Sequence, residues 1–509
     1  MFNIIYLFIW TICNSIKTFK IQTVKIKFVN LNDLNSYILI FGFIFLTQFA
    51  FIQYEVIDWD ESTYFLISKY VSEGNVLYVD YWEAKPPMYF IFMGIVFKIF
   101  NSTILVGRLA GDFLIFISTL FVYKILSKQY SKIISLSSSF LMIYLFSYKS
   151  SQPTMTEHLG ILFIVISFYL VINQKKDTNF YFLGILFSLA YNTRNNLAFA
   201  CLAIFIFLFI KNYLNIQKVV YIGLGFLTPI ISIAGYFIYH GKLANYIYML
   251  WEFPLQSTDS YRMNFNEFKI AFLNKLNLDE TISFELILFI VLLTILLYLF
   301  KNINQLIESD ISFLNILLLI FLAISIIFGG RLFNHYLIQL FPFIAILFGI
   351  GLSKINNKIF INIALGLSFV INLNLLIGGA QNLINYQNIS SNYPLKNIAN
   401  ELSNKGAVGR DVLALENHVI YMYNDEIVPF KVVHPSNLAN VERYTDILNS
   451  LANLGLTYKD EFRIFVNNKP SYIFCENYCY SHITMNFFEN NYELIYMIDN
   501  YKLFQKLSK

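Results

Sequence analysis

The sequence predicts a polytopic α-helical membrane protein with a small α/β domain at its C-terminal end. Of its 509 residues, 57% are hydrophobic and 13% are charged, whereas soluble domains carry about 25% charged residues. Apolar stretches long enough to cross a bilayer recur from near the N-terminus to about residue 380. This composition excludes a soluble enzyme, a disordered chain and a nucleic-acid binder of the basic-patch type. The four cysteines exclude a disulfide scaffold.

The chain begins with a basic segment, residues 1–36, which we expect to be cytoplasmic. After it, windows of about 20 apolar residues predict a membrane domain over residues 37–380 with about eleven spans. The spans lie near residues 37–54, 104–123, 133–148, 157–173, 179–193, 196–211, 218–239, 283–300, 311–328, 332–352 and 358–378. The apolar stretch 88–100 is too short to cross comfortably, so we expect it at the interface or re-entering the membrane.

Lysines determine the predicted orientation. With a cytoplasmic N-terminus, every short cytoplasmic loop of the eleven-span arrangement carries lysine, as the positive-inside rule requires. Residues 381–509 then form an extracytoplasmic domain, in which the runs 411–415 and 471–474 are typical of buried strands. Cys475 and Cys479 also lie there, and the sequence is compatible either with a disulfide between them or with two free thiols.

Charged side chains gather at the outer ends of the predicted spans. The first outer loop, residues 55–87, is acidic, and Arg108, Arg194 and Arg331 fall on the same side of the membrane. Arginines at membrane depth are costly and usually mark a site, so the joint pattern predicts an extracytoplasmic pocket for an anionic ligand. Each arginine could instead pair with lipid headgroups, and Arg108 could pair with Asp112 one helical turn later.

Several motifs occur in a defined order. Residues 58–64 read Asp-Trp-Asp-Glu-Ser-Thr-Tyr, residues 85–87 read Lys-Pro-Pro, and residues 107–109 read Gly-Arg-Leu. Further along, residues 331–342 combine Arg, His-Tyr and a final Pro. This set resembles the GT-C glycosyltransferase superfamily, and most closely its branch of protein O-mannosyltransferases and aminoarabinose transferases of lipid A. The resemblance implies a GT-C fold and a sugar donor linked to polyprenyl phosphate.

The resemblance also implies roles for individual residues. Transfer of a sugar from a phosphate needs a base for the acceptor hydroxyl, and Asp60 matches the family's position for it. Glu61 would orient Asp60 or hold the acceptor. Guanidinium groups bind phosphate oxygens in pairs. The candidates for binding the donor phosphate are Lys85, Arg194, Arg331 and His335. The candidates for supporting these residues are Asp58, Tyr64, Arg108, Glu157 and Tyr336.

The expected partners are a polyprenyl-phosphate-linked sugar and an acceptor that is a glycan, a lipid or a protein, with no role for nucleic acid. We expect no metal cofactor, although Asp58 and Asp60 would also suit a divalent cation. The predicted protein is therefore an inverting glycosyltransferase, with an extracytoplasmic active site in a bacterial inner membrane. The alternative is a transporter or flippase of a lipid-linked sugar. A flippase would need charges along a path through the bilayer, and the predicted spans are nearly free of them.

Overall fold

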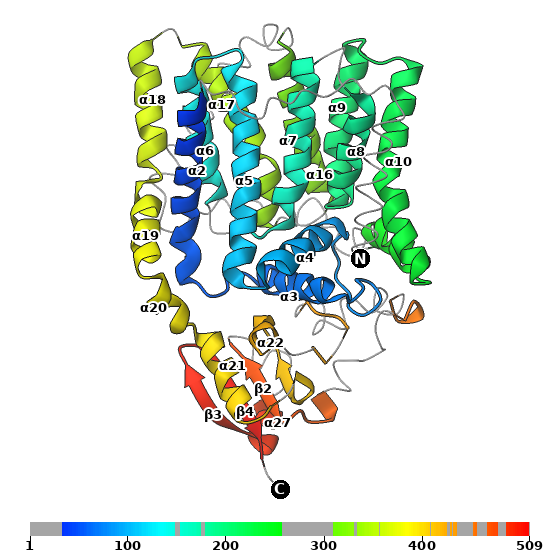
Figure 1. Cartoon of the computed structure of the whole chain (residues 1–509), viewed down its shortest axis with the longest axis vertical. Coiled ribbons are helices and arrows are strands. Elements are labelled where there is room, and N and C mark those ends of the chain that lie inside the picture. Colours follow the sequence, from blue (N-terminus) through cyan, green and yellow to red (C-terminus); the bar gives the residue numbers. More distant parts are fainter. Residues whose placement is uncertain are drawn as a thin grey trace. The chain divides into compact units, whose positions relative to one another are not determined.

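The computed structural model divides into two compact units, which are described separately (Figure 1). It describes residues 33–147, 153–174, 179–256, 309–329, 333–355, 357–407, 409–424, 428–429, 431–434, 451–455, 466–476 and 485–507. Unit 1 contains residues up to 48, 111–236 and 261–378, and unit 2 contains residues 49–110, 237–260 and 379–509. The units therefore do not follow the expected boundary near residue 380, because unit 2 joins the first outer loop to the C-terminal residues.

Unit 1 is a bundle of long apolar helices that run side by side in Figure 1. They are α2 (Leu34–Phe49), α5 (Ile104–Ser127, which begins in unit 2), α6 (Lys132–Phe146), α7 (Thr156–Gln174), α8 (Phe180–Tyr191), α9 (Ala198–Ile210), α10 (Ile216–Tyr239), α16 (Asp310–Phe328), α17 (Phe341–Ser353) and α18 (Lys358–Val370). The next helix, α19 (Leu373–Ile384), passes from unit 1 into unit 2. Short 3₁₀ segments precede α9 and α17, at Asn195–Leu197 and Asn334–Gln339.

Six of these described helical stretches are long and apolar enough to cross a membrane, and five more apolar helices are shorter. The expected span at 283–300 lies outside the described residues, so the count of eleven remains a prediction. The span expected at 332–352 differs in detail, because it includes the six-residue 3₁₀ segment Asn334–Gln339 and the α-helix begins only at Phe341. Pro342 explains this start, since proline has no N–H to donate and suits the first turn of a helix.

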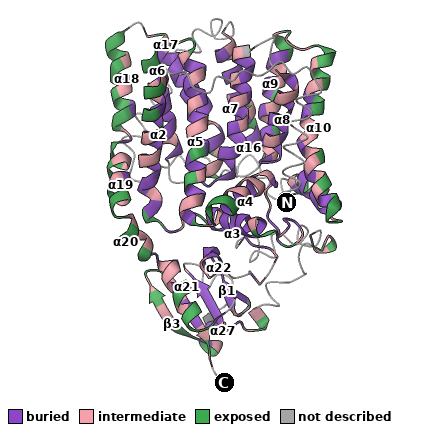
Figure 2. Ribbon diagram, in the orientation of Figure 1, coloured by how far each residue is buried: buried purple, intermediate pink, exposed green. Residues whose placement is uncertain are grey.

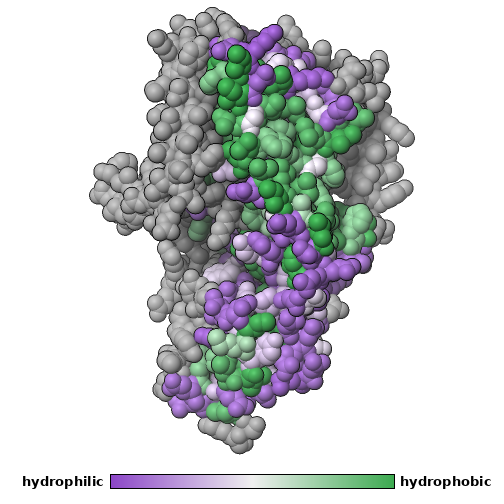
Figure 3. All heavy atoms as spheres, turned by 90° about the vertical axis from the view of Figure 1, so that its left-hand side faces the viewer, coloured by the Kyte–Doolittle hydropathy of each residue, from purple (hydrophilic) through white to green (hydrophobic). Residues whose placement is uncertain are grey.

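The burial pattern of unit 1 distinguishes central from peripheral helices (Figure 2). In α7, 78% of the apolar window is buried, against 17% for the window in Lys358–Ile384. The exposed side of α18 carries Ile359, Ile363, Leu367 and Val370, and Figure 3 shows a broad hydrophobic area on this face. An apolar surface of this extent is not stable in water, whereas it is typical of a helix that faces lipid. The protein is therefore a multi-pass membrane protein.

In unit 2, the first outer loop contains one α-helix, and a second helix follows the loop directly. Helix α3 (Trp59–Glu73) begins at Asp58, whose side chain accepts the N–H of Asp60 at 2.9 Å, as an N-cap aspartate does. Helix α4 (Met88–Phe100) is the short apolar stretch that was expected not to cross, and it packs against α3. Gly94 permits this approach, because a β-carbon there would lie only 2.8 Å from Cγ1 of Val71.

The C-terminal part of unit 2 is an α/β structure. Its elements are α20 (Tyr386–Ser391), α21 (Pro394–Asn404), η7 (Gly409–Asp411), β1 (Val412–Ala414), α22 (Val419–Tyr423), β2 (Tyr472–Cys475), α27 (Met485–Asn491), β3 (Tyr492–Ile498) and β4 (Tyr501–Lys506). The strands form one sheet in the order β1-β2-β4-β3, with β1 and β2 parallel and the other pairs antiparallel. The two strands expected from the sequence are β1 and β2. The hairpin of β3 and β4 was not expected, and Asp499 turns it with a φ of 52°.

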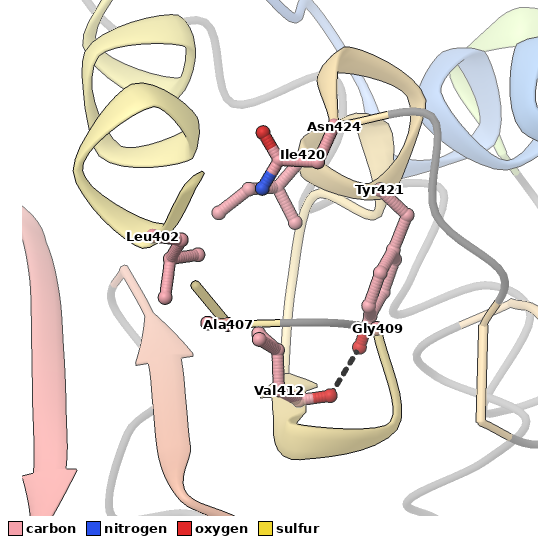
Figure 4. Close-up of a pocket in the computed structure, with 7 residues that line it drawn as sticks. All are labelled: Leu402, Ala407, Gly409, Val412, Ile420, Tyr421 and Asn424. Atoms are coloured by element: carbon pink, nitrogen blue, oxygen red, sulfur yellow. Dashed lines mark hydrogen bonds between the residues drawn. The ribbon is translucent and has the colours of Figure 1, made fainter. Parts of the chain in front are cut away.

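The core beside β1 is closely packed. A cavity of about 10 Å³ lies between α21, β1 and α22, enough for about one water molecule (Figure 4). Tyr421 closes one side of this cavity, where its hydroxyl donates to the carbonyl of Val412 at 2.9 Å and accepts the N–H of Ala414 at 3.0 Å. This cavity is too small for a substrate, so the tyrosine fixes α22 to the sheet.

A residue of the first outer loop caps a C-terminal helix. The Glu55 carboxylate accepts the N–H groups of Leu395 at 2.6 Å and Lys396 at 2.9 Å, with one oxygen for each. These are the second and third residues of α21, and Pro394 before them has no N–H. Glu55 thus satisfies two orphan donors of the helix and places a carboxylate at the positive end of its dipole.

Unit 2 should lose stability as the pH rises. Burial raises the pKa of Glu55 from its ordinary value of 4.5 to about 7, although the N–H groups of Leu395 and Lys396 oppose this shift. Because the folded-state pKa is the higher one, this stability is fully present below about pH 4.5 and is lost as the pH rises through about 7. The difference corresponds to about 3 kcal/mol. The thermal midpoint should fall over this range, and the neutral variant Glu55→Gln should fall less. Equal slopes for the two proteins would contradict the prediction.

Candidate active site

Asp60 lies at the start of α3, in the first turn, with its side chain largely but not completely buried. The hydroxyl of Tyr64 donates to Oδ2 of Asp60 at 2.8 Å, one helical turn further on. The two residues therefore share one face of the helix. Tyr64 is fully buried and packs edge-on against the rings of Tyr89 and Phe90 of α4. The α3–α4 pair thus holds one oxygen of the Asp60 carboxylate in a fixed place.

Glu61 forms a buried ion pair with Arg108. Nε and one terminal nitrogen of Arg108 donate to the two carboxylate oxygens of Glu61, each at 2.9 Å, and Glu61 is only 1% exposed. The remaining N–H groups of Arg108 donate to the carbonyls of Phe51, Tyr54 and Glu55. Glu61 also accepts the N–H of Ile57 at 2.9 Å.

These contacts correct one expectation from the sequence. Arg108 keeps a structural role, but its partner is Glu61 rather than Asp112, because all five of its donors are already used. The role expected for Glu61, to orient Asp60 or to hold the acceptor, stays a prediction. The contacts of Glu61 connect the start of α3 to the turn at residues 51–55 and to α5.

His434 is the residue of this cluster that the sequence did not reveal. Its Nε2 lies 2.8 Å from Oδ1 of Asp60, the oxygen that Tyr64 does not use. A parallel backbone bridge between Trp82 and Val432 brings it there, with the N–H of Trp82 donating to the carbonyl of Lys431 at 2.8 Å. His434 is 374 residues away from Asp60 and belongs to no motif, so no sequence signal could have found it.

Two further charged residues surround Asp60 and His434. Glu83 is buried at 1% exposure, and burial raises its pKa, while the charges of His434 and Lys85 oppose that rise. Burial lowers the pKa of His434, but its hydrogen bond to Asp60 and the charges of Glu83 and Asp60 outweigh burial, so its pKa is raised overall. Lys85 is half-buried. The result is a cluster of two carboxylates, one imidazole and one ammonium group, which we call the Asp60 cluster.

A second charged cluster lies in unit 1. One terminal nitrogen of Arg194 is 2.6 Å from Oε1 of Glu157, and both side chains are buried. The guanidinium also lies over the ring of Tyr336, 4.7 Å from its centroid, and His335 Nε2 is 3.8 Å from Oε1 of Glu157. These four residues form the Arg194 cluster. The sequence named all four, and the structure brings them together within this unit.

Some expected residues cannot be placed. Arg331 lies outside the described residues, so its role remains a prediction from the sequence. Cys475 is at the end of β2 and is disulfide-bonded, whereas Cys479, the partner that the sequence suggested, lies outside the described residues. Asp58 caps α3, and the described residues contain no group of three His, Cys, Asp or Glu side chains suited to a metal ion.

A larger cavity in unit 2 is separate from the Asp60 cluster. It has a volume of about 210 Å³. Its lining comes from the turn before α5, from α20 and α21, and from the end of α22, and it does not include Asp60, Glu83, Lys85 or His434. The lining of this cavity is therefore distinct from the Asp60 cluster.

Comparison with known proteins identifies the fold. The solved structure of ArnT from Cupriavidus metallidurans bound to undecaprenyl phosphate matches with a TM-score of 0.62 and 9% identity, over 94% of this chain and 99% of that chain. The chain has the GT-C glycosyltransferase fold. ArnT in its apo state matches with a TM-score of 0.54 and 11% identity, over 92% of this chain and 98% of that chain.

Sequence comparison adds one family match to the GT-C fold. Residues 84–237 match the family described as dolichyl-phosphate-mannose-protein mannosyltransferase. No curated protein sequence matches the chain. The matched segment contains the Lys-Pro-Pro motif and the whole of α5 to α9, and the resemblance to the mannosyltransferase and ArnT branch is thereby confirmed.

Proposed function

We propose that this protein is an inverting glycosyltransferase, which moves a sugar from a polyprenyl-phosphate donor to an acceptor hydroxyl at the outer face of a bacterial inner membrane. The observation that carries the proposal is the Asp60 carboxylate, held on one oxygen by Tyr64 and on the other by His434. The GT-C fold, the mannosyltransferase family match and the lipid phosphate bound to ArnT all support this activity.

The chemistry requires few groups. In a single displacement, the acceptor oxygen attacks the anomeric carbon, the carbon–phosphate oxygen bond breaks, and the lipid phosphate leaves with the bonding electrons. Asp60 takes the proton from the acceptor hydroxyl as that bond forms, because a hydroxyl is a poor nucleophile before its proton is removed. Each carboxylate oxygen has a second lone pair, so Asp60 can accept this proton while Tyr64 and His434 remain in contact with it.

The leaving phosphate needs positive charge rather than an acid, because it is already a stable anion. Lys85 is the cation of the Asp60 cluster and supplies a compact ammonium charge for a phosphate oxygen. Arg194 and His335 supply charge in the Arg194 cluster, and Arg331 is the further candidate from the sequence. Preorganised cations of this kind stabilise charge that develops in the transition state.

Substitutions in the Arg194 cluster can distinguish an arginine that binds the donor phosphate from one that only stabilises the fold. If Arg194 binds the donor phosphate, Glu157 competes with that phosphate for the guanidinium. Glu157→Gln should then lower the donor KM several-fold, whereas Arg194→Ala should raise it by about tenfold, as expected for a charged hydrogen bond of about 1.5 kcal/mol or more. Donor kinetics of the purified variants would measure both. If both substitutions destabilise the protein and neither changes the donor KM, the pair is structural.

The function itself is best tested by mass spectrometry of surface glycans, glycolipids and glycoproteins in a strain that lacks this gene. We expect one sugar to disappear from one class of acceptor, and to return with the wild-type gene but not with Asp60→Asn. The purified protein should then transfer that sugar from a polyprenyl-phosphate carrier in vitro. An unchanged profile of glycans, lipids and proteins would contradict the proposal. No contact in the described residues favours the transporter alternative.

A further inference from the structure

We propose that His434, which lies in the C-terminal part of the chain, is a positioning residue that aims the Asp60 carboxylate and keeps it in its charged form. The inference deepens the proposed function and rests on it for the role of Asp60. The sequence assigned no site residue to residues 381–509. The contact between His434 and Asp60 makes this part of the chain necessary for a competent base.

Geometry is the first argument. Oδ2 of Asp60 accepts the Tyr64 hydroxyl and Oδ1 lies 2.8 Å from Nε2 of His434, so the carboxylate is held at both ends. An aspartate side chain held at one oxygen can still rotate about its last bond, whereas contacts at both oxygens fix the plane of the carboxylate. The position of a base relative to the proton that it removes strongly affects its rate. His434 thereby fixes the direction in which the remaining lone pairs point.

The attachment of His434 is the second argument. The described residues before His434 are anchored to the first outer loop through Val428, Lys431 and Val432. The N–H of Val428 donates to the hydroxyl of Tyr70 at 3.0 Å, and the Lys431 ammonium donates to the carbonyl of Val79 at 3.2 Å. The bridge between Trp82 and Val432 lies between these contacts and His434. Backbone pairing therefore fixes the position of His434, and this position does not depend on a single side-chain contact. A residue that positions another side chain needs a fixed place of this kind.

Charge is the third argument. The titratable groups that interact electrostatically with His434 are Asp60 and Asp58 at the start of α3, Glu83 and Lys85 from the loop after it, and the imidazole of His418, whose pKa burial lowers. Three of these five groups are carboxylates, and Glu83 repels a charged Asp60. A positive or hydrogen-bonding imidazole in contact with Asp60 offsets that repulsion. Without it, Asp60 would take up a proton more readily and would lose its capacity as a base.

The experiment compares three variants in sugar transfer as a function of pH. His434→Gln retains an N–H donor but carries no charge, His434→Phe retains neither, and His240→Gln is the matched control at an exposed histidine of the same unit. An opposite charge at this range lowers an aspartate pKa by about 1–3 units. His434→Gln should therefore move the acidic limb of the kcat/KM profile upward by about one unit or more, with the donor KM unchanged.

The other two variants separate the effect of charge from the effect of orientation and provide the control. His434→Phe should show the same upward shift together with a lower kcat at every pH, because the carboxylate is no longer held. His240→Gln should follow the wild-type profile. If the acidic limb of His434→Gln coincides with that of the wild type, His434 does not control the charge of Asp60 and the inference is overturned. If His434→Gln and His434→Phe have the same kcat on the pH plateau, His434 does not orient the Asp60 carboxylate and this part of the inference is overturned.

A second measurement needs no turnover. Hydrogen–deuterium exchange at the C2 position of histidine, followed by mass spectrometry, reports the pKa of each imidazole in the folded protein. The pKa of His434 should lie above its ordinary value in the wild type and should fall in Asp60→Asn. An unchanged pKa of His434 would overturn the pairing. A wild-type protein without transferase activity would contradict the proposed function alone, and the exchange measurement would still test the pair.

Discussion

Asp60→Asn should reduce the rate of sugar transfer by about 10²–10⁴-fold, the usual contribution of base catalysis. The amide has almost the shape of the carboxylate and can still contact Tyr64 and His434, but it cannot take the proton of the acceptor hydroxyl. Expression, thermal stability and donor binding should remain close to wild type, because the exchange removes a charge without opening a cavity. Steady-state transfer from a polyprenyl-phosphate sugar, with donor binding measured separately, would test this.

Asp58→Asn is the matched control for that experiment. Asp58 lies two residues before Asp60 and caps α3 with its side-chain oxygen, and asparagine caps a helix about as well as aspartate. Its activity should therefore remain within a few-fold of wild type. If Asp58→Asn is as inactive as Asp60→Asn and chelators inhibit the wild type, a divalent cation is bound between them. Near wild-type activity of Asp60→Asn would assign the base to another carboxylate.

Glu61→Ala should have the largest effect on stability. Removing one partner of a buried ion pair leaves the other charge without compensation and costs about 3–5 kcal/mol. Arg108 would retain only carbonyl partners in an environment without water. We expect the yield of folded protein to fall strongly, the thermal midpoint to drop, and Glu61→Gln to be milder because an amide can still accept from the guanidinium. Thermal unfolding of the purified variants measures the effect.

The control for Glu61 lies on the same helix. Glu73 pairs with Lys69 at 3.2 Å, but its side chain is 44% exposed, and exposed pairs contribute about 0–1 kcal/mol. Glu73→Ala should therefore be close to wild type. If Glu61→Ala folds normally and loses activity instead, Glu61 takes part in catalysis and its structural role is disproved.

Much of the fold could be predicted from the sequence, because spans and strands are local patterns. The apolar windows predicted most of the described helices of unit 1, and the short stretch 88–100 was correctly separated from them, as helix α4. The break before α17 was missed. A run of apolar residues shows no change in hydropathy where the backbone changes from a 3₁₀ to an α-helical turn, and only Pro342 marked the place.

Contacts within the site could be predicted only where the residues involved lie close together in the sequence. Asp60 and Tyr64 lie four residues apart on one helix, and their contact follows from that spacing. The partner of Arg108 does not follow from spacing, because Glu61 is 47 positions away and the nearer Asp112 satisfied the same rule. His434 is further still, and its position depends on how the first outer loop pairs with residues 431–433. Long-range backbone pairing of this kind leaves no periodic trace in a single sequence.

The bridge between Trp82 and Val432 also bears on how this protein is made. The two residues are separated by most of the chain, and a contact between such distant positions forms late and slowly, because a long loop must first be closed. During synthesis the helices of the bundle and the first outer loop emerge long before residue 434 leaves the ribosome. Asp60 therefore remains without its histidine until biogenesis is nearly complete, and a prematurely terminated chain would reach the membrane with its donor-binding residues but without a competent base.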